Sequence, residues 1–469
     1  MKKLYIIMMI GVMTIFGTTS CDESLDINTN PLVASSADPN AILPYVLVQY
    51  SNRKATELGT RILDVPQHVS ACFNSPRNGA TTSFLTGNTW FMMYNQVLGN
   101  LQLVELDAKE AGAPSNNVAA IAVILKAMTF YELSSIWGDV PFSQAINGQE
   151  FPLPTFDSQE NVFRGVVDLL DEAMTLIDGM PATGVFDVSV GDLIYEGDMD
   201  NWRRFANSLK LRVLMLLRNK VNVDAQITTA LSQPLIEDNS QAAMLKYVGG
   251  PGQSHAYNQL VEAFFGISNE AQEVYGVGEP LYDALVNNSD PREGLFIADP
   301  DNGGAPDNGT FPAGEAVIAD NIIRDNYPDV WFLPSEVSLY RAELALLNVS
   351  SDDAQTYYNQ GVTQALQFWG QDIPGVVNTL SSSEISTYVS SLAAPTLADV
   401  HEQLYLESFL RPVVAWNTVR RTGVPALTPP PSANISTILK RFNYPPDEIG
   451  SNPNTPTNLP TDSPMWFEK

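Results

Sequence analysis

The chain has 469 residues, which is enough for one large domain or two ordinary ones. It holds 25 Lys and Arg against 53 Asp and Glu, a formal net charge of −28 at pH 7. A surface this acidic repels polyanions, so the composition excludes a protein that binds DNA or RNA through a basic face. The acidic residues are spread along the chain, which indicates a role in solubility and not one anionic site.

The first twenty residues have the pattern of an export signal. Lys2 and Lys3 precede an apolar run from Leu4 to Phe16, and small polar residues then lead into Cys21. This pattern predicts a lipoprotein signal peptide over residues 1–20, cleavage before Cys21, and a lipid on that cysteine. A plain secretory signal that ends near a chance cysteine is the alternative.

The only other cysteine is Cys72, which would then have no partner for an internal disulfide. We expect Cys72 to be a buried, unreactive thiol, because no base is adjacent to it in the sequence. Residues 21–40 are polar and rich in turn-forming residues, and they predict a flexible tether between the lipid and the folded body.

Apolar residues recur with the period of an α-helix along much of the remaining chain. Ser158 is a candidate N-cap, Gly138 a helix stop, and Pro412 is expected to kink or break the last helix. The predicted helices cover residues 88–109, 117–137, 158–177, 201–217, 224–231, 335–347, 352–369, 383–392 and 396–421.

Neighbouring helices are joined by short turns, which indicates a solenoid of tetratricopeptide-like helix pairs. Long irregular stretches separate these helices, and the longest is a loop-rich insertion at about 248–330. Strand patterns are sparse, with one short candidate at 243–247. After the signal peptide, no stretch is expected to span a membrane.

Five segments in this order resemble a known family. They are LKAMTFYELSSIWGDVPFSQA (125–145), NWRRFANSLKLRVLMLLRN (201–219), SEVSLYRAELALLN with YYNQGVTQALQFWG (335–370), HEQLYLESFLRPVVAWNTVRRTGVPAL (401–427) and ILKRFNYPPDEIGSNPNT (438–455). Behind a lipoprotein signal, the series resembles a divergent branch of the SusD/RagB-like nutrient-binding outer-membrane lipoproteins.

This resemblance implies a mainly α fold, with tetratricopeptide-like helix pairs supporting an irregular, loop-rich face, in one domain over residues 41–469. It implies a lipid-anchored protein on the outside of the outer membrane, which binds a glycan or a peptide and passes it to a SusC-like TonB-dependent transporter. It implies no catalytic residues. Asp22, Glu23 and Asp26, just after Cys21, resemble the surface-export signal of such proteins.

Sugar recognition needs flat apolar rings for the C–H face of a pyranose, and amides, carboxylates or guanidinium groups for its hydroxyls. Such residues are expected on exposed loops, and ordinary packing is the alternative for each of them. The candidates are Phe73, Asn74, Arg77, His255, Tyr257, Asn258, Phe264, Phe265, Tyr275, Arg324, Tyr327 and Trp331. In Trp137-Gly138-Asp139-Val140-Pro141, a packed helix end is favoured over a ligand-contacting loop.

No metal or cofactor is expected. The loop after Asp299 has oxygen-bearing residues, but position twelve, where a calcium loop carries a bidentate Glu, is Thr310. The three histidines have no zinc-protease spacing, and neither a nucleophile elbow nor a phosphate loop is present in the sequence.

The sequence therefore predicts a non-enzymatic surface lipoprotein that binds a nutrient, an oligosaccharide in preference to a peptide, for import. Two alternatives remain at this stage. An extracellular hydrolase would turn over a glycan, and a helical-repeat scaffold would bind only protein.

Overall fold

The fold is seen in a computed structural model, which describes residues 38–54, 62–71, 83–177, 186–250, 252–256, 258–259, 275–304, 314–319, 322, 324–376, 378–429, 435–457 and 459–468. The stretch from Asp38 to the C-terminus forms one compact unit. The expected signal peptide, Cys21, Cys72 and residues 21–37 of the expected tether lie outside the described residues.

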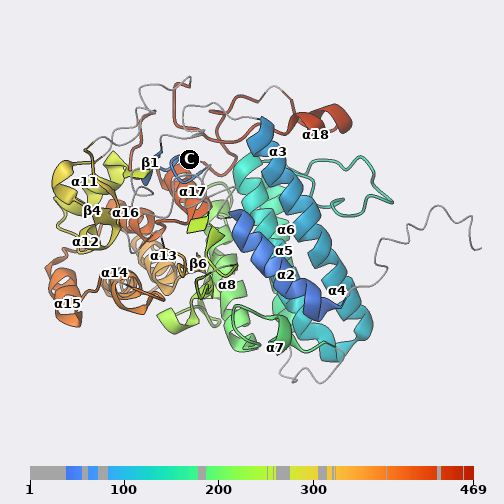
Figure 1. The fold of residues 1–469 in the computed structure, drawn as a ribbon, viewed down its shortest axis with the longest axis horizontal. Coiled ribbons are helices and arrows are strands. Elements are labelled where there is room, and N and C mark those ends of the chain that lie inside the picture. Colours follow the sequence, from blue (N-terminus) through green and yellow to red (C-terminus); the bar gives the residue numbers. More distant parts are fainter. Residues whose placement is uncertain are drawn as a thin grey trace, which may run out of the picture. The chain divides into compact units, whose positions relative to one another are not determined.

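The N-terminal half is built of long helices that lie alongside one another (Figure 1). Contacts join α5 to α4 and α6, α6 to α8, and α2 to α4. The helical elements of this half are α2 (Pro39–Arg53), α3 (Ser83–Phe91), the π-helix Met92–Leu98, α4 (Gly99–Ala111), the 3₁₀ turn Ala113–Ser115, α5 (Asn116–Trp137), α6 (Gln159–Leu176), α7 (Val188–Gly191), α8 (Met199–Leu217), α9 (Asp224–Leu231) and the 3₁₀ turn Asn239–Gln241.

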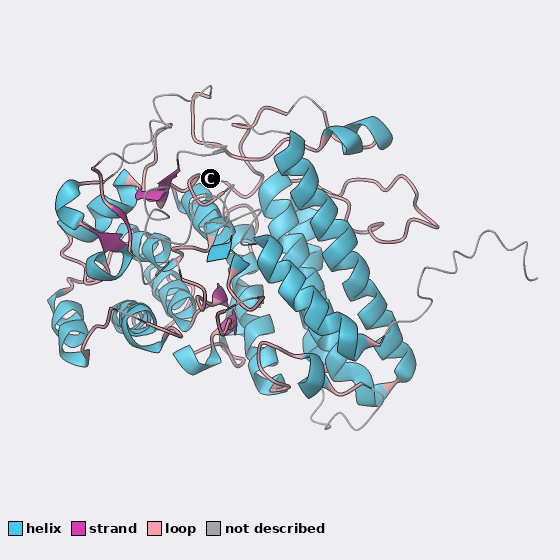
Figure 2. Cartoon of the chain, viewed as in Figure 1, coloured by secondary structure: helices cyan, strands magenta, loops and turns pink. Residues whose placement is uncertain are grey.

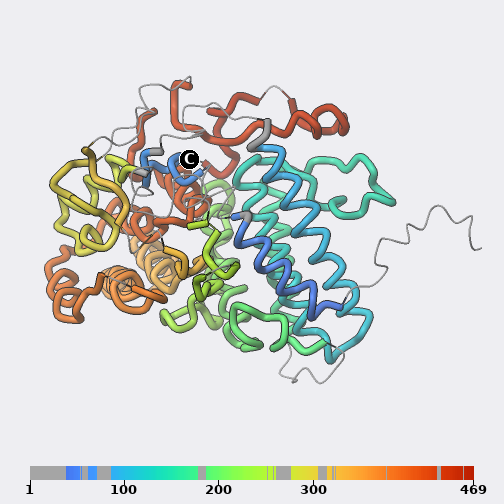
Figure 3. Tube along the Cα trace, viewed as in Figure 1, coloured from blue at the N-terminus to red at the C-terminus, as the bar shows by residue number. Residues whose placement is uncertain are grey.

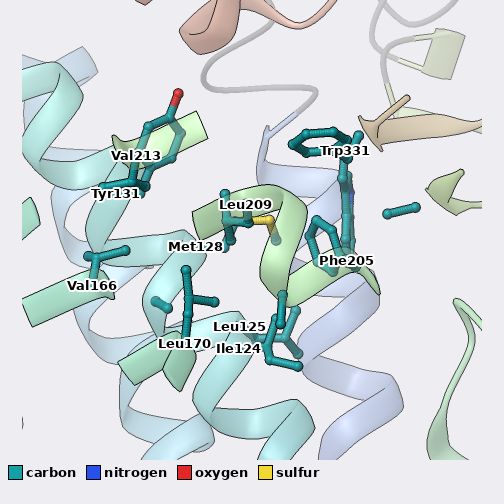
Figure 4. Packing of buried hydrophobic residues seen from close by; sticks show 14 of the residues in the cluster. Ile124, Leu125, Met128, Tyr131, Val166, Leu170, Phe205, Leu209, Val213 and Trp331 are labelled. Carbon is teal, nitrogen blue, oxygen red and sulfur yellow. The ribbon is translucent and has the colours of Figure 1, made fainter. Parts of the chain in front are cut away.

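Helix α5 is the centre of this half. Figure 4 shows Ile124, Leu125 and Met128 of α5 among side chains from α6 and α8. The segment Ala113–Trp137 is long and apolar enough to cross a membrane, contrary to the expectation from the sequence, but its apolar stretch of 18 residues is buried inside the protein. A helix that is apolar all round is suited to such a core position, because neighbouring helices cover every face.

The second half mixes shorter helices with small sheets, and Figure 2 shows how little strand there is. Helices α13 and α14 pack as a pair, and α16 packs against both α13 and α17. The helical elements here are α11 (Glu279–Asn287), α12 (Glu293–Phe296), the 3₁₀ turn Pro300–Asn302, α13 (Pro334–Leu346), α14 (Ala354–Gln367), the π-helix Phe368–Asp372, α15 (Ser382–Ser391), α16 (Leu397–Glu407), α17 (Pro412–Thr422) and α18 (Pro446–Ser451).

Within the described residues, two antiparallel sheets join segments that are distant in the sequence. The larger has the strand order β1-β3-β5-β4, from β1 (Val69–Ala71), β3 (Tyr275–Val277), β5 (Val317–Ile318) and β4 (Ile297–Ala298). Val69 pairs with Val277, Gly276 with Val317, and Ile297 with Ile318. The smaller pairs β2 (Ala243–Leu245) with β6 (Asp329–Phe332).

The prediction of a mainly α protein with paired helices is confirmed, and most helix bounds lie within a few residues of those expected. The Ser158 side chain accepts a hydrogen bond from the Asn161 amide, as a helix N-cap does. Pro412 separates α16 from α17, so the last predicted helix is two helices, with proline at the first position of the second. The expected 243–247 strand is β2.

The expected boundary between tether and domain is wrong by two residues. Helix α2 begins inside the predicted tether, where Asp38 caps it through the Asn40 amide and Pro39 occupies a position that needs no N–H partner. The loop-rich 248–330 insertion contains short ordered elements, namely α11, α12 and strands β3 to β5.

Candidate functional site

Several of the predicted ligand-binding side chains fall outside the described part of the chain. These are Phe73, Asn74, Arg77, Tyr257, Phe264 and Phe265. Tyr275 is described through its backbone only, as the first residue of β3. The predictions for these residues stay predictions.

His255, Tyr327 and Trp331 are described, and all three are buried. The His255 ring lies 5.5 Å from the Tyr327 ring between centroids, and Trp331 is 1% exposed and 6.3 Å from Phe205 (Figure 4). Trp331 was expected in a loop, but it belongs to β6, which pairs with β2. These rings pack against other side chains, and a ligand would reach them only after a neighbour moved.

Asn258 is also buried, whereas Arg324 is partly exposed. The Arg324 guanidinium lies 5.4 Å from the Tyr327 ring centre, donates to Asn326 and donates to the Pro374 carbonyl. Its remaining nitrogen, Nη1, has no hydrogen-bond partner among the described atoms. Of the predicted residues that the structure describes, Arg324 is the one with a buried side-chain nitrogen that lacks a partner.

A hollow of about 740 Å³ lies elsewhere, beside α3 and the start of the π-helix that follows it. Three segments that are far apart in the sequence form it: the end of α3 with the start of the π-helix, the loop after α5, and the start of α18. Figure 3 shows the loop after α5 in teal and the α18 segment in red near the same end of α3. The lining residues are Gly87, Asn88, Trp90, Phe91, Tyr94, Asn95, Pro141, Ala145, Ile146, Pro154, Pro445, Pro446, Asp447, Glu448 and Ser451.

Aromatic rings form the floor of the hollow. Trp90 is 8% exposed, with ring centroids 4.8 Å from Tyr94, 5.1 Å from Trp137 and 6.0 Å from Tyr444. The Tyr94 hydroxyl donates to the Pro141 carbonyl at 2.8 Å. These contacts fix the two rings that line the hollow, so the floor is rigid before any ligand arrives.

Phe91 has a different environment from the floor. Its side chain is 56% exposed at the edge of the hollow, although the next two residues, Met92 and Met93, are buried. The π-helix begins directly after Phe91. Because a π-turn shifts the register of the helix, it changes which side chains face outward, and such turns are frequent at functional sites.

Polar groups of three kinds surround these rings. Asn88 and Asn95 carry amides, Ser451 a hydroxyl, and Asp447 and Glu448 carboxylates. A pyranose offers an apolar C–H face and a rim of hydroxyls, so aromatic faces together with amides and carboxylates are the groups that would bind it. A hollow of this volume can hold a ligand of a few sugar units, because ligand pockets have volumes of about 300–1,000 Å³.

Hydrogen bonds hold the two walls of the hollow, which are the loop after α5 and α18. The Asp157 carboxylate accepts from the backbone amides of Phe142 and Ser143, at 3.1 and 2.8 Å. The Asn452 side chain, just after α18, donates to the Pro154 carbonyl at 2.9 Å. The second bond joins the α18 wall directly to the loop wall.

The Trp137-to-Pro141 motif is a packed helix end, and its last residue also lines the hollow. Trp137 is fully buried and donates from its indole to the Asn443 carbonyl at 3.0 Å, as expected of a packed helix end. Gly138 has a φ of 86°, in the left-handed region that stops α5. Pro141 lines the hollow, so the same turn places part of its wall.

The residues predicted from the sequence do not include this site. Trp90 and Tyr94 fit the period of a buried helix face, and nothing local shows that their outer edges border a hollow. Phe91 is a local signal of the site, because its large ring is outside the apolar helix face formed by Trp90 and Tyr94. Asp447 and Glu448 lie in the 438–455 segment, whose only signal in the sequence is its resemblance to the family.

Metal chemistry gains no support in the described residues, where no group of three or more His, Cys, Asp or Glu side chains could hold an ion. The calcium alternative involved residues 299–310, of which 305–310 lie outside the described part. Asp299 to Asn302 form the start and body of a short 3₁₀ turn.

Comparisons with known proteins give one consistent result for the fold. A chitin-binding protein is 21% identical, with a TM-score of 0.78 over 92% of this chain and 100% of that one. A SusD-like protein from Bacteroidetes AC2a is 20% identical with a TM-score of 0.79, again over 92% and 100% of the two chains. A SusD homologue from Bacteroides fragilis is 22% identical with a TM-score of 0.71 over the same shares.

No curated protein matches this chain. The model of the SusD-like family, described as starch-binding and associating with the outer membrane, matches residues 34–445. That match spans both halves of the fold and the lining of the hollow up to Pro445, whereas Pro446, Asp447, Glu448 and Ser451 of α18 lie beyond it. The chain therefore belongs to the SusD-like family of outer-membrane-associated, glycan-binding proteins.

Proposed function

We propose that this protein is a lipoprotein of the outer cell surface that captures an oligosaccharide in the hollow beside α3 and passes it to a TonB-dependent transporter. Membership of the SusD-like family supports the glycan-binding part. The signal pattern before Cys21 supports the lipid anchor, and Asp22, Glu23 and Asp26 support display on the outside. The protein acts by binding alone, with no catalytic step.

The observation that carries the capture step is the Phe91 ring. It is 56% exposed at the edge of a hollow whose floor is aromatic and whose walls carry amides and carboxylates. A large exposed ring costs free energy in water, so its position beside convergent polar groups is best explained by a ligand that covers it.

The contribution of Phe91 to the binding free energy follows from the area of its ring that a ligand would cover. A phenylalanine buries about 150–250 Å² when fully covered, so a ring that is 56% exposed leaves roughly 110 Å² in water. A pyranose that covers one face would remove roughly 50 Å² of this, worth about 1.3 kcal/mol at about 25 cal/mol per Å². That free energy corresponds to about a tenfold change in Kd.

The test uses the full-length chain, purified in detergent and titrated by calorimetry with malto-, cello- and chito-oligosaccharides and with a peptide panel. We expect a saccharide to bind and Phe91→Ala to weaken that binding about tenfold. Leu106→Ala is the matched control, because Leu106 is a 52% exposed apolar residue on α4 that does not line the hollow. An unchanged Kd in Phe91→Ala would contradict capture at the hollow.

The same samples separate the alternatives. Chromatography of the incubated saccharide detects hydrolysis, and any product would favour the hydrolase. Binding of peptides alone would identify a peptide importer, and binding of neither class would favour the scaffold. Co-purification of a tagged chain from outer membranes tests the transporter, which we expect to be recovered with it.

A further inference from the structure

The charge around the hollow is one-sided. Asp447 and Glu448 are its two ionisable acids, and none of the residues that line it is Lys, Arg or His. The two carboxylates are consecutive in the first turn of α18, so both are carried by one wall. An ionic group on a bound saccharide would therefore meet negative charge and no lining cation.

Both carboxylates have unused acceptor capacity. Asp447 is exposed, and no described group donates to its carboxylate. Glu448 accepts from the Asn452 side chain at 3.1 Å through one oxygen, Oε1, and its other oxygen has no donor among the described residues. An ionised carboxylate can accept several hydrogen bonds, so this wall can still receive donors from a ligand.

A basic side chain lies near the hollow, but it is not among the residues that line it. Arg441 is 7% exposed, with its guanidinium 5.3 Å from the centre of the Tyr444 ring, and it donates to the Trp137 carbonyl. Arg441 therefore contacts Trp137 and Tyr444, whose rings pack against Trp90 of the floor. At the floor itself, burial raises the pKa of Tyr94, and the charge of Glu448 raises it further, as expected in a negative field.

We propose that the hollow selects a saccharide with a protonated amino group over its N-acetylated and anionic counterparts. This selectivity rests on the proposed capture of saccharides at the hollow. The ammonium donates to Asp447 and Glu448 in charge-assisted hydrogen bonds, while the C–H face of the ring covers Phe91. The neighbouring aromatic faces add to the attraction, because a cation is favoured within about 6 Å of a ring centroid.

The expected difference in affinity is modest, because the two carboxylates lie on a wall that is exposed to water. Exposed ion pairs contribute about 0.2–1 kcal/mol each, so we expect the amino saccharide to bind about threefold to tenfold more tightly than the N-acetylated one. A uronate of the same length should bind more weakly than both, since the same carboxylates repel it.

The experiment titrates the full-length chain in detergent at about pH 6 and low salt with three tetramers: glucosamine, N-acetylglucosamine and galacturonate. Asp447→Asn and Glu448→Gln, singly and together, should weaken binding of the glucosamine tetramer more than binding of the N-acetylated tetramer, so that the preference between the two is lost. Asp168→Asn is the matched control, because Asp168 is an exposed acid on α6 outside the hollow. Added salt should reduce the preference.

The outcomes separate the two proposals. Equal or tighter binding of the N-acetylated tetramer would overturn the selectivity, but it would leave saccharide capture in place. A preference that survives in the double variant would overturn the role of these two carboxylates. If no tetramer bound, saccharide capture at the hollow would be refuted, and the selectivity with it.

Discussion

Removal of one buried carboxylate should destabilise the whole fold. Glu336, in the first turn of α13, is fully buried and lies between two guanidinium groups. Arg212 of α8 donates to it at 2.6 and 2.7 Å, and Arg411, just before α17, donates at 2.7 Å. These bonds join the N-terminal helices to the second half, so the change Glu336→Gln tests how strongly the halves depend on each other.

The magnitude follows from the charges that would be left behind. In Glu336→Gln, Arg212 and Arg411 stay buried with Glu407 as the one remaining carboxylate that bonds to either of them among the described residues. Loss of one partner from a buried ion pair costs about 3–5 kcal/mol, because an uncompensated charge stays in the interior. That is a large part of a typical unfolding free energy of about 5–15 kcal/mol.

The pH dependence has a defined sign. Burial alone would raise the pKa of Glu336, but the charges and hydrogen bonds of Arg212 and Arg411 outweigh it and lower the pKa to about 2. The folded pKa is below the unfolded value, which is about 4.3, so the carboxylate stabilises the fold fully above about pH 5. That stabilisation is lost as the pH falls toward 2. Glu336→Gln should lose less unfolding free energy over this window than the unchanged protein.

Urea unfolding followed by circular dichroism measures both effects. Glu160→Gln is the control, because Glu160 forms an exposed pair with Arg164 at 2.8 Å and its loss should cost less than about 1 kcal/mol. Glu336 would not have this role if Glu336→Gln cost no more unfolding free energy than the control, or if the variant and the unchanged protein had the same dependence of stability on pH.

Two further predictions concern the wall of the hollow. Gly165→Ala should lower the unfolding free energy by about 1–3 kcal/mol, since the new Cβ would lie 2.2 Å from a ring carbon of Phe142; an unchanged urea midpoint would contradict this. Asp157→Ala removes the carboxylate that holds the amides of Phe142 and Ser143, so hydrogen exchange in residues 141–146 should become faster and saccharide affinity should fall severalfold. Unchanged protection in that loop would show that other contacts hold the wall.

The sequence predicted the helices well where the signals were local. The apolar period over 159–176, the Ser158 cap and the break at Pro412 each depend on residues within a few turns of one another. Helix α2 was missed because its turn formers and its internal Pro44 resemble a linker, and the helix is stabilised by packing against α4 and α7. Propensity is a weak prior when tertiary contacts decide the outcome.

The candidate site was harder to predict because it is not local. Its lining comes from residues 87–95, 141–154 and 445–451, and no spacing within one segment indicates that these meet. Trp331 differs from its prediction in the other direction. It was expected on an exposed loop because it lies in an irregular stretch of sequence, but it is buried in β6. Burial of the ring depends on the pairing of β6 with β2, whose residues lie more than eighty positions earlier.

The most direct test of the account is a crystal structure of the full chain with its tightest-binding oligosaccharide. We expect a sugar ring stacked on Phe91, with its polar groups at Asn88 or Asn95 and at the carboxylates of Asp447 and Glu448. A saccharide bound instead beside Arg324, with the hollow next to α3 empty, would contradict it.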